Sequence, residues 1–524
     1  MDGTGIPSTA AQRIPSFEWH LLFLLSAGLL FFLHLGRQDL WASHEARAAQ
    51  DAQGILDHGQ WALPRLFDGQ SELQKPAGYY WLVAAAAEMD GGRVEAWVVR
   101  LPAAISALLT LVLVWLHLRR AGRSVAALIA VTVLGTAIHF VTLARTGRID
   151  MPLTCAVAAA MLISCGSRTT ERRSSLVTAL ALGVIFGIAL LLKGPIGVVL
   201  PCSAIAIWKL IDRRQSMLPR NGSIAWSSLA VAVLIGPVIA LPWYLCANAE
   251  TNGEFFRVFF VYHHFNRAFG GAPTLAGHPW WYYVPRFAAD FLPWTPGLFV
   301  AISACCRSDL LKHDRLARFG LVWLLVMLVV LSCSRFKRAD YLLPAFPGAA
   351  IFLGCVAERW YVAATARTQC FARAGFGLVL LGSLAGWSIY EDRFEPQQAA
   401  LHEQRAFADF IRQRCPIPQP VLFFRVESHL LAFHLGRPLH TLVEWGELND
   451  LLAEPGMHYF VTRAEFVPEC LRNVRTRPLE MIARSEEFST RPPLRPLVLM
   501  RSIPPAPTSP NLSLQALPSQ TSMD

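Results

Sequence analysis

The stretch Gln74-Lys-Pro-Ala-Gly-Tyr-Tyr-Trp81 lies inside a long charged segment, residues 37–97, that separates two apolar runs. These runs, at about 18–36 and 98–118, are each long enough to cross a bilayer, because a transmembrane helix needs about 20 apolar residues. The segment between them is rich in carboxylates and aromatic side chains, which a simple connector does not need. It therefore predicts a first outside loop that takes part in function.

The composition indicates a membrane protein. Of the 524 residues, 54% are hydrophobic and only 16% are charged, whereas soluble domains carry about 25% charged residues. The formal net charge of +10 is typical of short basic cytoplasmic loops, and no nucleic-acid motif accompanies it. The 11 cysteines are scattered without a C-x-x-C pair, so most are expected to be small buried hydrophobic residues.

Apolar runs recur through residues 1–390 and predict a polytopic α-helical membrane protein with about eleven spans. They lie at about 18–36, 98–118, 124–143, 151–166, 175–193, 195–211, 226–246, 287–306, 317–332, 341–358 and 373–390. The loops after the even-numbered runs are short and basic, which predicts that they are cytoplasmic. The N-terminus is then inside, and the odd-numbered loops, beginning with 37–97, are outside.

The chain changes character after residue 390. Segment 391–502 is more charged and predicts a small soluble α/β domain outside the membrane, and 503–524 is Pro/Ser-rich and predicts a disordered tail. An amphipathic helix is expected at 400–414, with strands at 420–424, 458–462 and 497–501. Cys415 and Cys470 fall in this domain and are expected to pair, because an oxidising compartment favours disulfides.

Basic residues in the outside loops run against the usual charge bias. They are Arg145, Arg148, Lys193, Arg257, Arg267, Arg335, Lys337 and Arg338. Pairing with phospholipid headgroups is one explanation. The other is a shared cavity that neutralises the phosphate of a lipid carrier, since Arg and Lys provide fixed charge and convergent donors. Their origin in separate loops favours the cavity.

Two carboxylates in the outside loops are candidates for chemistry. Asp150 follows a hairpin of only a few residues at the membrane surface, where an ionisable group is costly and therefore a functional candidate. Capping of the following span is the alternative for Asp150. Glu45 begins an alanine-rich helical stretch in the first loop, and a solvated helix face is its alternative. His264 is a candidate donor to a phosphate.

The order of these segments resembles the GT-C glycosyltransferases, in the branch of the bacterial lipid A aminoarabinose transferases and the protein O-mannosyltransferases. The residues that carry the resemblance are Glu45–Arg47, Gly59–Pro64, Gln74–Trp81, Arg100–Pro102, Arg148–Asp150, Leu192–Pro195, Pro242–Tyr244 with His264–Arg267, and Lys337–Pro344. Any one of these matches is weak. Eight matches in the right order, each on the expected side of the membrane, are specific.

The resemblance implies inverting transfer of a sugar from a polyprenyl-phosphate carrier to a lipid, glycan or protein acceptor. The reaction would take place in the bacterial inner membrane, with the active site facing the periplasm and no tightly bound organic cofactor. The catalytic residues expected are Glu45, Asp150 and His44. The substrate-binding residues expected are Arg47, Lys75, Tyr79, Arg148, Lys193, His264, Arg267, Lys337 and Tyr341.

Two positions depart from the family pattern. His44 stands where the family's D-E-x-R begins with Asp, and Gln74 stands where its E-K-P-P begins with Glu. A histidine can accept a proton near neutral pH. It has no carboxylate oxygens, however, and these are the ligands that a hard divalent metal prefers. The sequence therefore assigns no metal ligand and leaves dependence on a divalent metal open.

Two other functional classes compete with the transferase. A transporter or flippase of an anionic lipid or solute would also use a basic outer cavity, but it is expected to show inverted repeats, and the sequence has none. A non-catalytic membrane scaffold would place the function in the outer domain. The charged first loop favours the transferase.

The loop charges predict the topology directly. A reporter fused at residue 45 or at residue 430 should be located outside the cytoplasm, and one in the loop at 119–123 should be located inside. Cysteine labelling of intact cells with an impermeant reagent measures both. Cytoplasmic labelling at 45 or 430 would contradict the site assignment.

Overall fold

The computed structural model describes residues 17–166, 172–215, 224–266 and 277–503. The chain divides into two compact units, Met1–His402 and Glu403–Asp524. The division falls after His402 rather than near residue 390, because the last long helix of the first unit continues through a π-helical turn into one more short helix.

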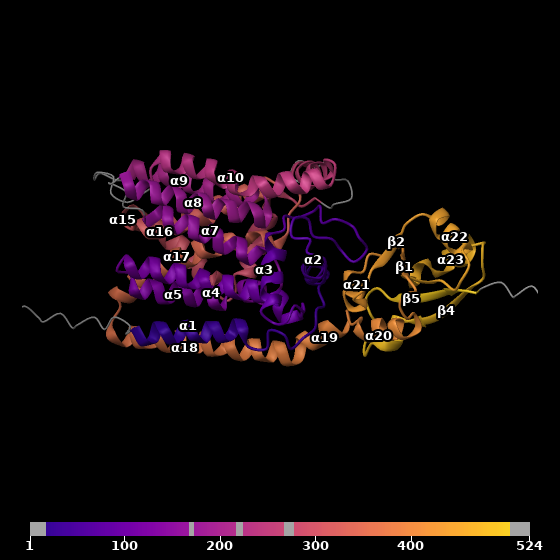
Figure 1. Cartoon of the computed structure of the whole chain (residues 1–524). Coiled ribbons are helices and arrows are strands. Elements are labelled where there is room, and N and C mark those ends of the chain that lie inside the picture. Colours follow the sequence, from indigo (N-terminus) through magenta and orange to yellow (C-terminus); the bar gives the residue numbers. More distant parts are fainter. Residues whose placement is uncertain (1–16, 167–171, 216–223, 267–276, 504–524) are drawn as a thin grey trace, which may run out of the picture. The chain divides into compact units, whose positions relative to one another are not determined.

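The first unit is helical (Figure 1). Its helices are α1 Phe17–Phe32, α2 Ser43–His58, α3 Gly78–Glu88, α4 Ala96–Arg120, α5 Ser124–Thr136, α6 Ile138–Ala144, α7 Asp150–Gly166, α8 Arg172–Lys193, α9 Ile196–Gln215, α10 Trp226–Glu250, α11 Glu254–Phe256, η1 Arg257–Asn266, η2 Trp280–Tyr282, α13 Tyr283–Asp290, α14 Thr295–Cys306, α15 Leu310–His313, α16 Arg315–Ser332, η3 Ala339–Ala345, α17 Phe346–Ala363, α18 Ala366–Ile389, η4 Tyr390–Phe394 and α19 Glu395–Ala400.

Several of these helices are long and apolar enough to cross a membrane, so the protein is a polytopic helical membrane protein. In the described residues six helical segments meet this condition, and the number rises to eight if each of two bent pairs is one span. The six segments start in α4, α8, α10, α16, η3 and α18, respectively. The apolar helices α1 and α7 are shorter than a full span, with 16 and 17 residues.

One bent pair shows how a span is broken. α5 and α6 meet at an angle of 67°, and Ala137 between them is extended, with ψ 125°. The backbone N–H of Ile138 donates to the carbonyl of Leu292 at 3.0 Å instead of continuing the helix. The indole N–H of Trp294 donates to the hydroxyl of Thr136 at 2.9 Å. The segment that leads into α14 therefore satisfies the polar groups that the break exposes.

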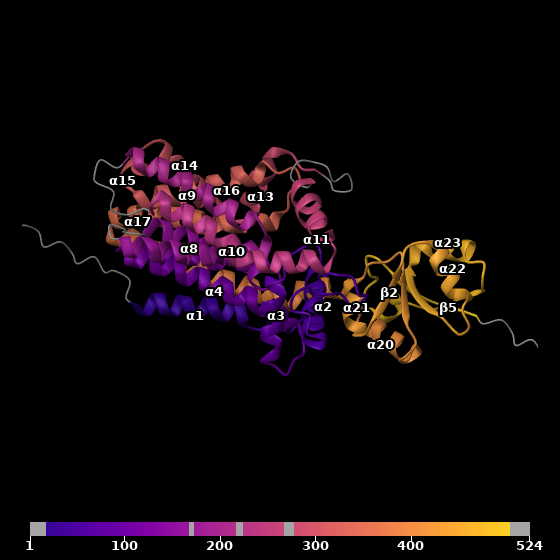
Figure 2. The same cartoon turned by 45° about the horizontal axis from the view of Figure 1, so that its top comes forward.

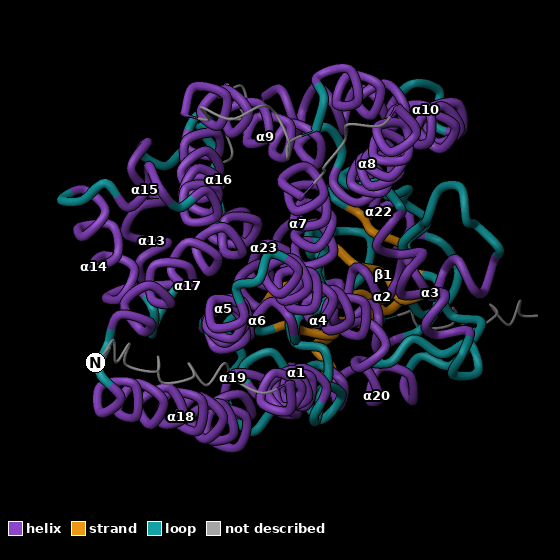
Figure 3. The backbone as a smooth tube through the Cα atoms, turned by 90° about the vertical axis from the view of Figure 1, so that its left-hand side faces the viewer, coloured by secondary structure: helices purple, strands orange, loops and turns teal. Residues whose placement is uncertain are grey.

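Small residues let the bundle pack closely around α4. Ala103, Ala104 and Ala107 are fully buried on this helix, and Figure 3, which views the helices nearly end-on, shows α4 beside α7. At Gly147 an added Cβ would lie 2.5 Å from a methyl carbon of Val99 on α4. The turn before α7 can therefore press directly against α4, and this fixes where Asp150 begins its helix.

The first loop is folded tightly onto the membrane helices. α2 ends at Gly59, whose φ of 67° is left-handed and whose N–H donates to the carbonyl of Ile55, a helix end that glycine adopts without strain. The chain beyond it is held by two indoles, because Trp81 donates to the carbonyl of Trp61 and Trp243 to that of Ala62. These aromatic side chains therefore fasten the loop to α3 and α10.

The second unit contains a five-stranded mixed sheet in the order β2-β1-β3-β5-β4. Its elements are α20 Arg405–Arg414, β1 Val421–Phe424, α21 His429–Leu435, β2 Leu439–Leu442, α22 Trp445–Ala453, β3 Tyr459–Arg463, η5 Ala464–Phe466, α23 Val467–Asn473, β4 Leu479–Arg484, η6 Ser485–Phe488 and β5 Leu497–Ser502. β1 pairs in parallel with β2 and β3, and β5 is antiparallel to β3 and β4.

The strands β1, β3 and β5 lie where apolar runs predicted strands, and α20 lies within the predicted amphipathic helix. These three strands are central in the sheet and are largely buried, so their sequences are continuously apolar. The sequence reading missed β2 and β4. Both are edge strands with exposed polar residues, and a strand that is only partly covered has a weaker apolar pattern.

The predicted disulfide between Cys415 and Cys470 is wrong, because both are free thiols. Cys470 lies on α23 and packs with α22 against one face of the sheet. Cys415 follows α20, which Figures 1 and 2 draw on the opposite side of the sheet from α22 and α23. Burial raises the pKa of each thiol to about 11, so both are unreactive in the folded unit.

Close packing of α3 against α8 gives a test of the fold. An added Cβ at Gly78 would lie 2.6 Å from the carbonyl oxygen of Leu191, and overpacking of this kind costs about 1–3 kcal/mol. Gly78→Ala should therefore lower the unfolding temperature measured in detergent. Gly382→Ala is the matched control, because its Cβ would meet no atom within 4 Å. Equal unfolding temperatures for the two variants would contradict this packing.

Candidate active site

A cavity of about 580 Å³ opens among α7, α8, α9, η1, α16 and the loop before α3. Its polar lining consists of Gln74, Lys75, Asp150, Lys193, His263, His264, Tyr283, Ser334 and Tyr341. Most of the remaining lining is aliphatic or aromatic, including Leu153, Val199 and Phe260. Two lysines, a carboxylate and extensive apolar walls suit a ligand with an anionic head and an apolar tail.

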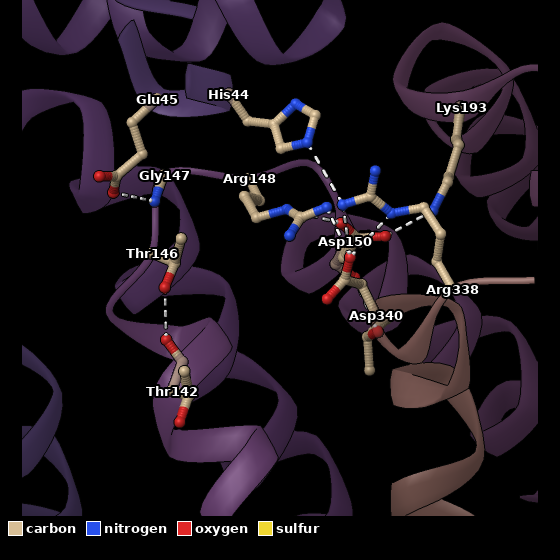
Figure 4. Close-up of polar contacts among 11 residues, drawn as sticks. His44, Glu45, Thr142, Thr146, Gly147, Arg148, Asp150, Lys193, Arg338 and Asp340 are labelled. Atoms are coloured by element: carbon tan, nitrogen blue, oxygen red, sulfur yellow. Dashed lines mark hydrogen bonds and ion pairs between the residues drawn. The ribbon is translucent and has the colours of Figure 1, made fainter. Parts of the chain in front are cut away.

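Asp150 is the carboxylate of this cavity. It is the first residue of α7 and only 3% exposed, and the positive end of the helix dipole favours a carboxylate there. One carboxylate oxygen accepts from the Lys193 ammonium, and the other lies 3.4 Å from Nε of Arg148. The Lys193 ammonium also lies 4.1 Å from the centre of the Tyr341 ring. Figure 4 shows this group with its neighbours.

A second carboxylate, Asp340, joins the arginines around Asp150. Its Oδ2 atom receives Arg148 at 2.6 Å and Arg338 at 3.2 Å. Arg338 in turn contacts Nε2 of His44 at 3.2 Å. The network runs from His44 through Arg338, Asp340 and Arg148 to Asp150 and connects the first loop with the turn before α7 and with η3 (Figure 4).

His44 is uncharged in this network. Burial, together with the nearby cations Lys75, Arg148 and Arg338, lowers its pKa to about 3. Its Nε2 atom then accepts a hydrogen bond from Arg338. His44 is therefore neutral, with its Nε2 lone pair engaged by Arg338, and its role as a base stays a prediction.

Glu45 lies outside the cavity lining. It is 1% exposed, and its carboxylate forms a two-pronged ion pair with Arg100, with N–O distances of 2.9 and 3.2 Å. Its Oε1 atom also accepts the backbone N–H of Gly147 at 2.8 Å. Figure 4 shows Glu45 directed at Gly147 and away from Asp150. The expectation that both carboxylates open onto one cavity therefore holds for Asp150 and fails for Glu45.

Glu72, which the sequence reading did not select, organises the loop that carries Lys75. Its carboxylate accepts from Nε of Arg47 at 2.7 Å and from the hydroxyl of Tyr80 at 3.2 Å. It also accepts the backbone N–H groups of Gln74, at 2.6 Å, and Lys75, at 3.1 Å. The only signal in the sequence was an acidic residue two positions before Gln74.

Lys75 is a cavity cation that titrates near physiological pH. Burial lowers its pKa to about 8, with Glu72 opposing this and Arg47 and Arg148 reinforcing it. Lys75 is therefore mostly charged at pH 7 and loses its charge as the pH rises through about 8. Its ammonium is available to an anionic ligand at neutral pH.

Of the other predicted binding residues, some line the cavity and others do not. Tyr341 and His264 line the cavity. Tyr79 is buried and donates to the carbonyl of Val99 at 2.7 Å. Lys337 is 3% exposed and donates to the carbonyls of His278 and Ser334, so it does not reach the cavity. Arg267 lies outside the described residues.

The carboxylates Asp150 and Asp340 each form ion pairs with basic side chains. In the described ranges no group of three His, Cys, Asp or Glu side chains has a geometry that could hold a metal ion. Asp150 and Asp340 are joined through Arg148. The first loop offers His44 in place of a carboxylate.

Comparison with known proteins shows which transferases this chain is similar to. A family model described as dolichyl-phosphate-mannose-protein mannosyltransferase matches residues 74–243. The undecaprenyl phosphate-alpha-4-amino-4-deoxy-L-arabinose arabinosyl transferase of Pseudomonas paraeruginosa is 29% identical over 371 residues, which cover 70% of this chain and 63% of that protein. A second such transferase, from Pseudomonas fluorescens, is 31% identical over 345 residues, 64% of this chain and 56% of that protein.

In sequence the chain is similar to these transferases, over part of their length and part of its own. The fold agrees, because the crystal structure of ArnT from Cupriavidus metallidurans bound to undecaprenyl phosphate matches with a TM-score of 0.71 and 20% identity. That match covers 92% of this chain and 98% of the other. The archaeal oligosaccharyltransferase AglB from Archaeoglobus fulgidus matches with a TM-score of 0.51 and 13% identity, over 87% and 70% of the two chains. The chain spans less than two thirds of the length of the two Pseudomonas relatives.

The buried position of Glu45 leads to a stability test. Glu45→Ala leaves the Arg100 guanidinium buried without its carboxylate, which costs about 3–5 kcal/mol. The variant should therefore unfold at a lower temperature and yield less folded protein. Glu45→Leu with Arg100→Met removes both charges and should recover part of the loss. If the Glu45→Ala protein unfolds like the wild type, Glu45 is not needed for stability, and the prediction that it is catalytic is favoured again.

Proposed function

We propose that this protein is a membrane glycosyltransferase that moves a sugar from a polyprenyl-phosphate carrier to an acceptor outside the cytoplasm. The observation that carries the proposal is the cavity in which Lys75, Lys193 and Asp150 meet extensive apolar walls. A polyprenyl phosphate has the matching chemistry, an anionic head on a long hydrocarbon chain. The names of the Pseudomonas relatives and of the ArnT structure include undecaprenyl phosphate, a carrier of this class.

The two lysines would stabilise the departing carrier phosphate. When the bond between the anomeric carbon and the phosphate oxygen breaks, that oxygen keeps the electron pair and negative charge grows on the phosphate. Asp150 holds the Lys193 ammonium and Glu72 holds the backbone that carries Lys75, so little reorganisation is needed when this charge appears. Arg148, which lies between Asp150 and Asp340, would add positive potential nearby.

Asp150 would accept a hydrogen bond from the attacking acceptor group and take its proton as the new bond forms, when that proton becomes strongly acidic. Its ionised form is stabilised by Lys193 and Arg148, and it lines the same cavity as the two lysines. The new bond would form between the acceptor and the anomeric carbon on the side opposite the leaving phosphate, which inverts the sugar. Tyr341 and His264 would line the path of the sugar or of the carrier.

The remaining residues of the site would act as scaffold. Glu45 and Arg100 would hold the first loop on α4, and Arg47 with Glu72 would hold the segment that carries Lys75. Tyr79 would fasten α3 to α4, and Lys337 would close the turn before η3. In this assignment they support the geometry of the cavity and do not touch the reacting atoms.

We further propose a bacterial inner-membrane location with about eleven spans, the N-terminus in the cytoplasm and the catalytic cavity facing the periplasm. The second unit would then be a soluble periplasmic α/β domain, followed by a tail at 503–524. The names of the Pseudomonas relatives favour an aminoarabinose-like sugar. The acceptor would be a lipid, a glycan or a protein.

Substitution of the cavity lysines tests the proposed function. Loss of a charge-assisted contact to a phosphate costs about 1.5–3 kcal/mol, so Lys75→Ala and Lys193→Ala should each lower transfer about tenfold or more. The assay measures sugar transfer from an undecaprenyl-phosphate-linked donor to envelope material by purified protein in lipid. Lys312→Ala, at an exposed lysine paired with Asp309 on α15, is the control and should leave transfer unchanged.

The pH dependence gives a second measurement on the same proteins. Because the pKa of Lys75 is about 8, the KM for the donor should rise as the pH increases through that value. Lys75→Ala should lack this rise. Carrier binding by the wild type without any sugar transfer would contradict the transferase and favour a lipid transporter.

A further inference from the structure

Asp51 is a buried acid without a basic partner. It lies on α2 and is 0% exposed, and no N–H or O–H group of the described chain donates to either of its carboxylate oxygens. Its acidic neighbour is Glu72, whose charge acts on it. Two carboxyl groups can share a hydrogen bond only when one of them carries a proton, because an ionised carboxylate is solely an acceptor.

The surroundings decide which of the two acids is protonated. Glu72 receives four donors, from Arg47, Tyr80 and the backbone of Gln74 and Lys75, and such donors favour the ionised form. Asp51 receives none. Burial raises the pKa of Asp51 well above its ordinary value, the charge of Glu72 adds to this, and Arg47 and Lys75 oppose it. The proton therefore resides on Asp51.

This pair lies directly behind a residue of the cavity. The Oε1 atom of Glu72 accepts the consecutive backbone N–H groups of Gln74 and Lys75, and so determines the course of the loop at the point where Lys75 leaves it. Both Gln74 and Lys75 line the cavity. A shift of the Glu72 carboxylate would therefore move the Lys75 ammonium.

We propose that Asp51 is a positioning residue, a neutral acid that donates its proton to Glu72 and so holds Lys75 in place for an anionic ligand. Its role in carrier binding rests on the proposed function, whereas its protonation does not. The charged and titratable groups that face Asp51 are Arg47 on its own helix, Glu72 and Lys75 in the following loop, and Tyr80 on α3. Asp51 does not touch the cavity and takes no part in bond making.

The sign of the effect on stability follows from proton linkage. The folded protein keeps the proton on Asp51, while the unfolded chain releases it near the ordinary carboxyl pKa. The folded state therefore binds more protons, and its stability falls as the pH rises from that value toward the raised pKa of Asp51. An asparagine has nearly the same shape and can donate to Glu72 without needing a proton, so it avoids this loss.

The test compares Asp51→Asn with Asp51→Leu in the full-length protein. Asp51→Asn should unfold at a higher temperature than the wild type at pH 7, and the difference should grow between pH 6 and 8. Its affinity for undecaprenyl phosphate in detergent micelles should equal that of the wild type at pH 7. Asp51→Leu, which cannot donate to Glu72, should bind the same probe about tenfold more weakly.

Asp57→Asn is the matched control, because Asp57 is an exposed carboxylate on the same helix that accepts from Gln53. It should change neither the unfolding temperature nor the affinity. Asp51→Asn unfolding below the wild type at every pH would show an ionised, stabilising carboxylate and overturn the proposal. Asp51→Leu with unchanged affinity would overturn it as well.

The two proposals fail in different ways. If the transferase is wrong, the wild-type protein itself shows no sugar transfer, and the comparison of unfolding temperatures is unaffected. If the role of Asp51 is wrong, the wild type transfers sugar while its pH-dependent stability matches that of Asp51→Asn.

Discussion

The structure depends first on the buried ion pair between Glu45 and Arg100. The Arg100 guanidinium also donates to the backbone carbonyls of Leu35, Gln38 and Asp39, so one side chain gathers the end of the first apolar segment, the start of the first loop and α4. Through Glu45 the same pair reaches the backbone of Gly147. A buried guanidinium is tolerated only when its donors are satisfied, and the chain here is folded so that they are.

The placement of the other charges follows from this arrangement. The turn that begins at Gly147 carries Arg148 and Asp150, so the pair that anchors the first loop also sets the entrance of α7. Arg148 then bridges Asp150 and Asp340, which brings η3 to the same place. Lys75 and Lys193 line the cavity, where Lys193 pairs with Asp150. The apolar walls beside them exclude water and strengthen their field.

The carboxylates of the site have distinct tasks because their neighbours differ. Glu45 and Glu72 are enclosed by donors from the backbone and from arginines, and they act on the shape of the loops. Asp150 shares its charge with Lys193 at the cavity surface, where a ligand can reach both. No donor of the described chain reaches Asp51, and we propose that it holds a proton. Glu45 and Glu72 therefore fix the loops, whereas in our proposals Asp150 reacts with the substrate and Asp51 holds a proton.

The sequence by itself determined the class of the protein and the order of its parts. Apolar runs and loop charges established a helical membrane protein, and the motifs around Lys75, Asp150 and Lys193 pointed to the residues that meet in the cavity. These signals are local, because a transmembrane span and a short motif are each written within a few consecutive residues. The central strands β1, β3 and β5 were readable for the same reason.

Only the tertiary structure decided how these residues divide the work. Glu45 and Lys337 resemble site residues in sequence. In the structure, however, Glu45 pairs with Arg100 and Lys337 donates to backbone carbonyls. Glu72 lies in none of the matched motifs, and Asp340 lies inside Lys337–Pro344 without having been predicted as a site residue. Both gain their roles from groups distant in the chain. Edge strands β2 and β4, and the separation of Cys415 from Cys470 by a sheet, were equally hidden. Hydrogen-bond partners and burial depend on which segments meet in space, and local sequence does not contain that information.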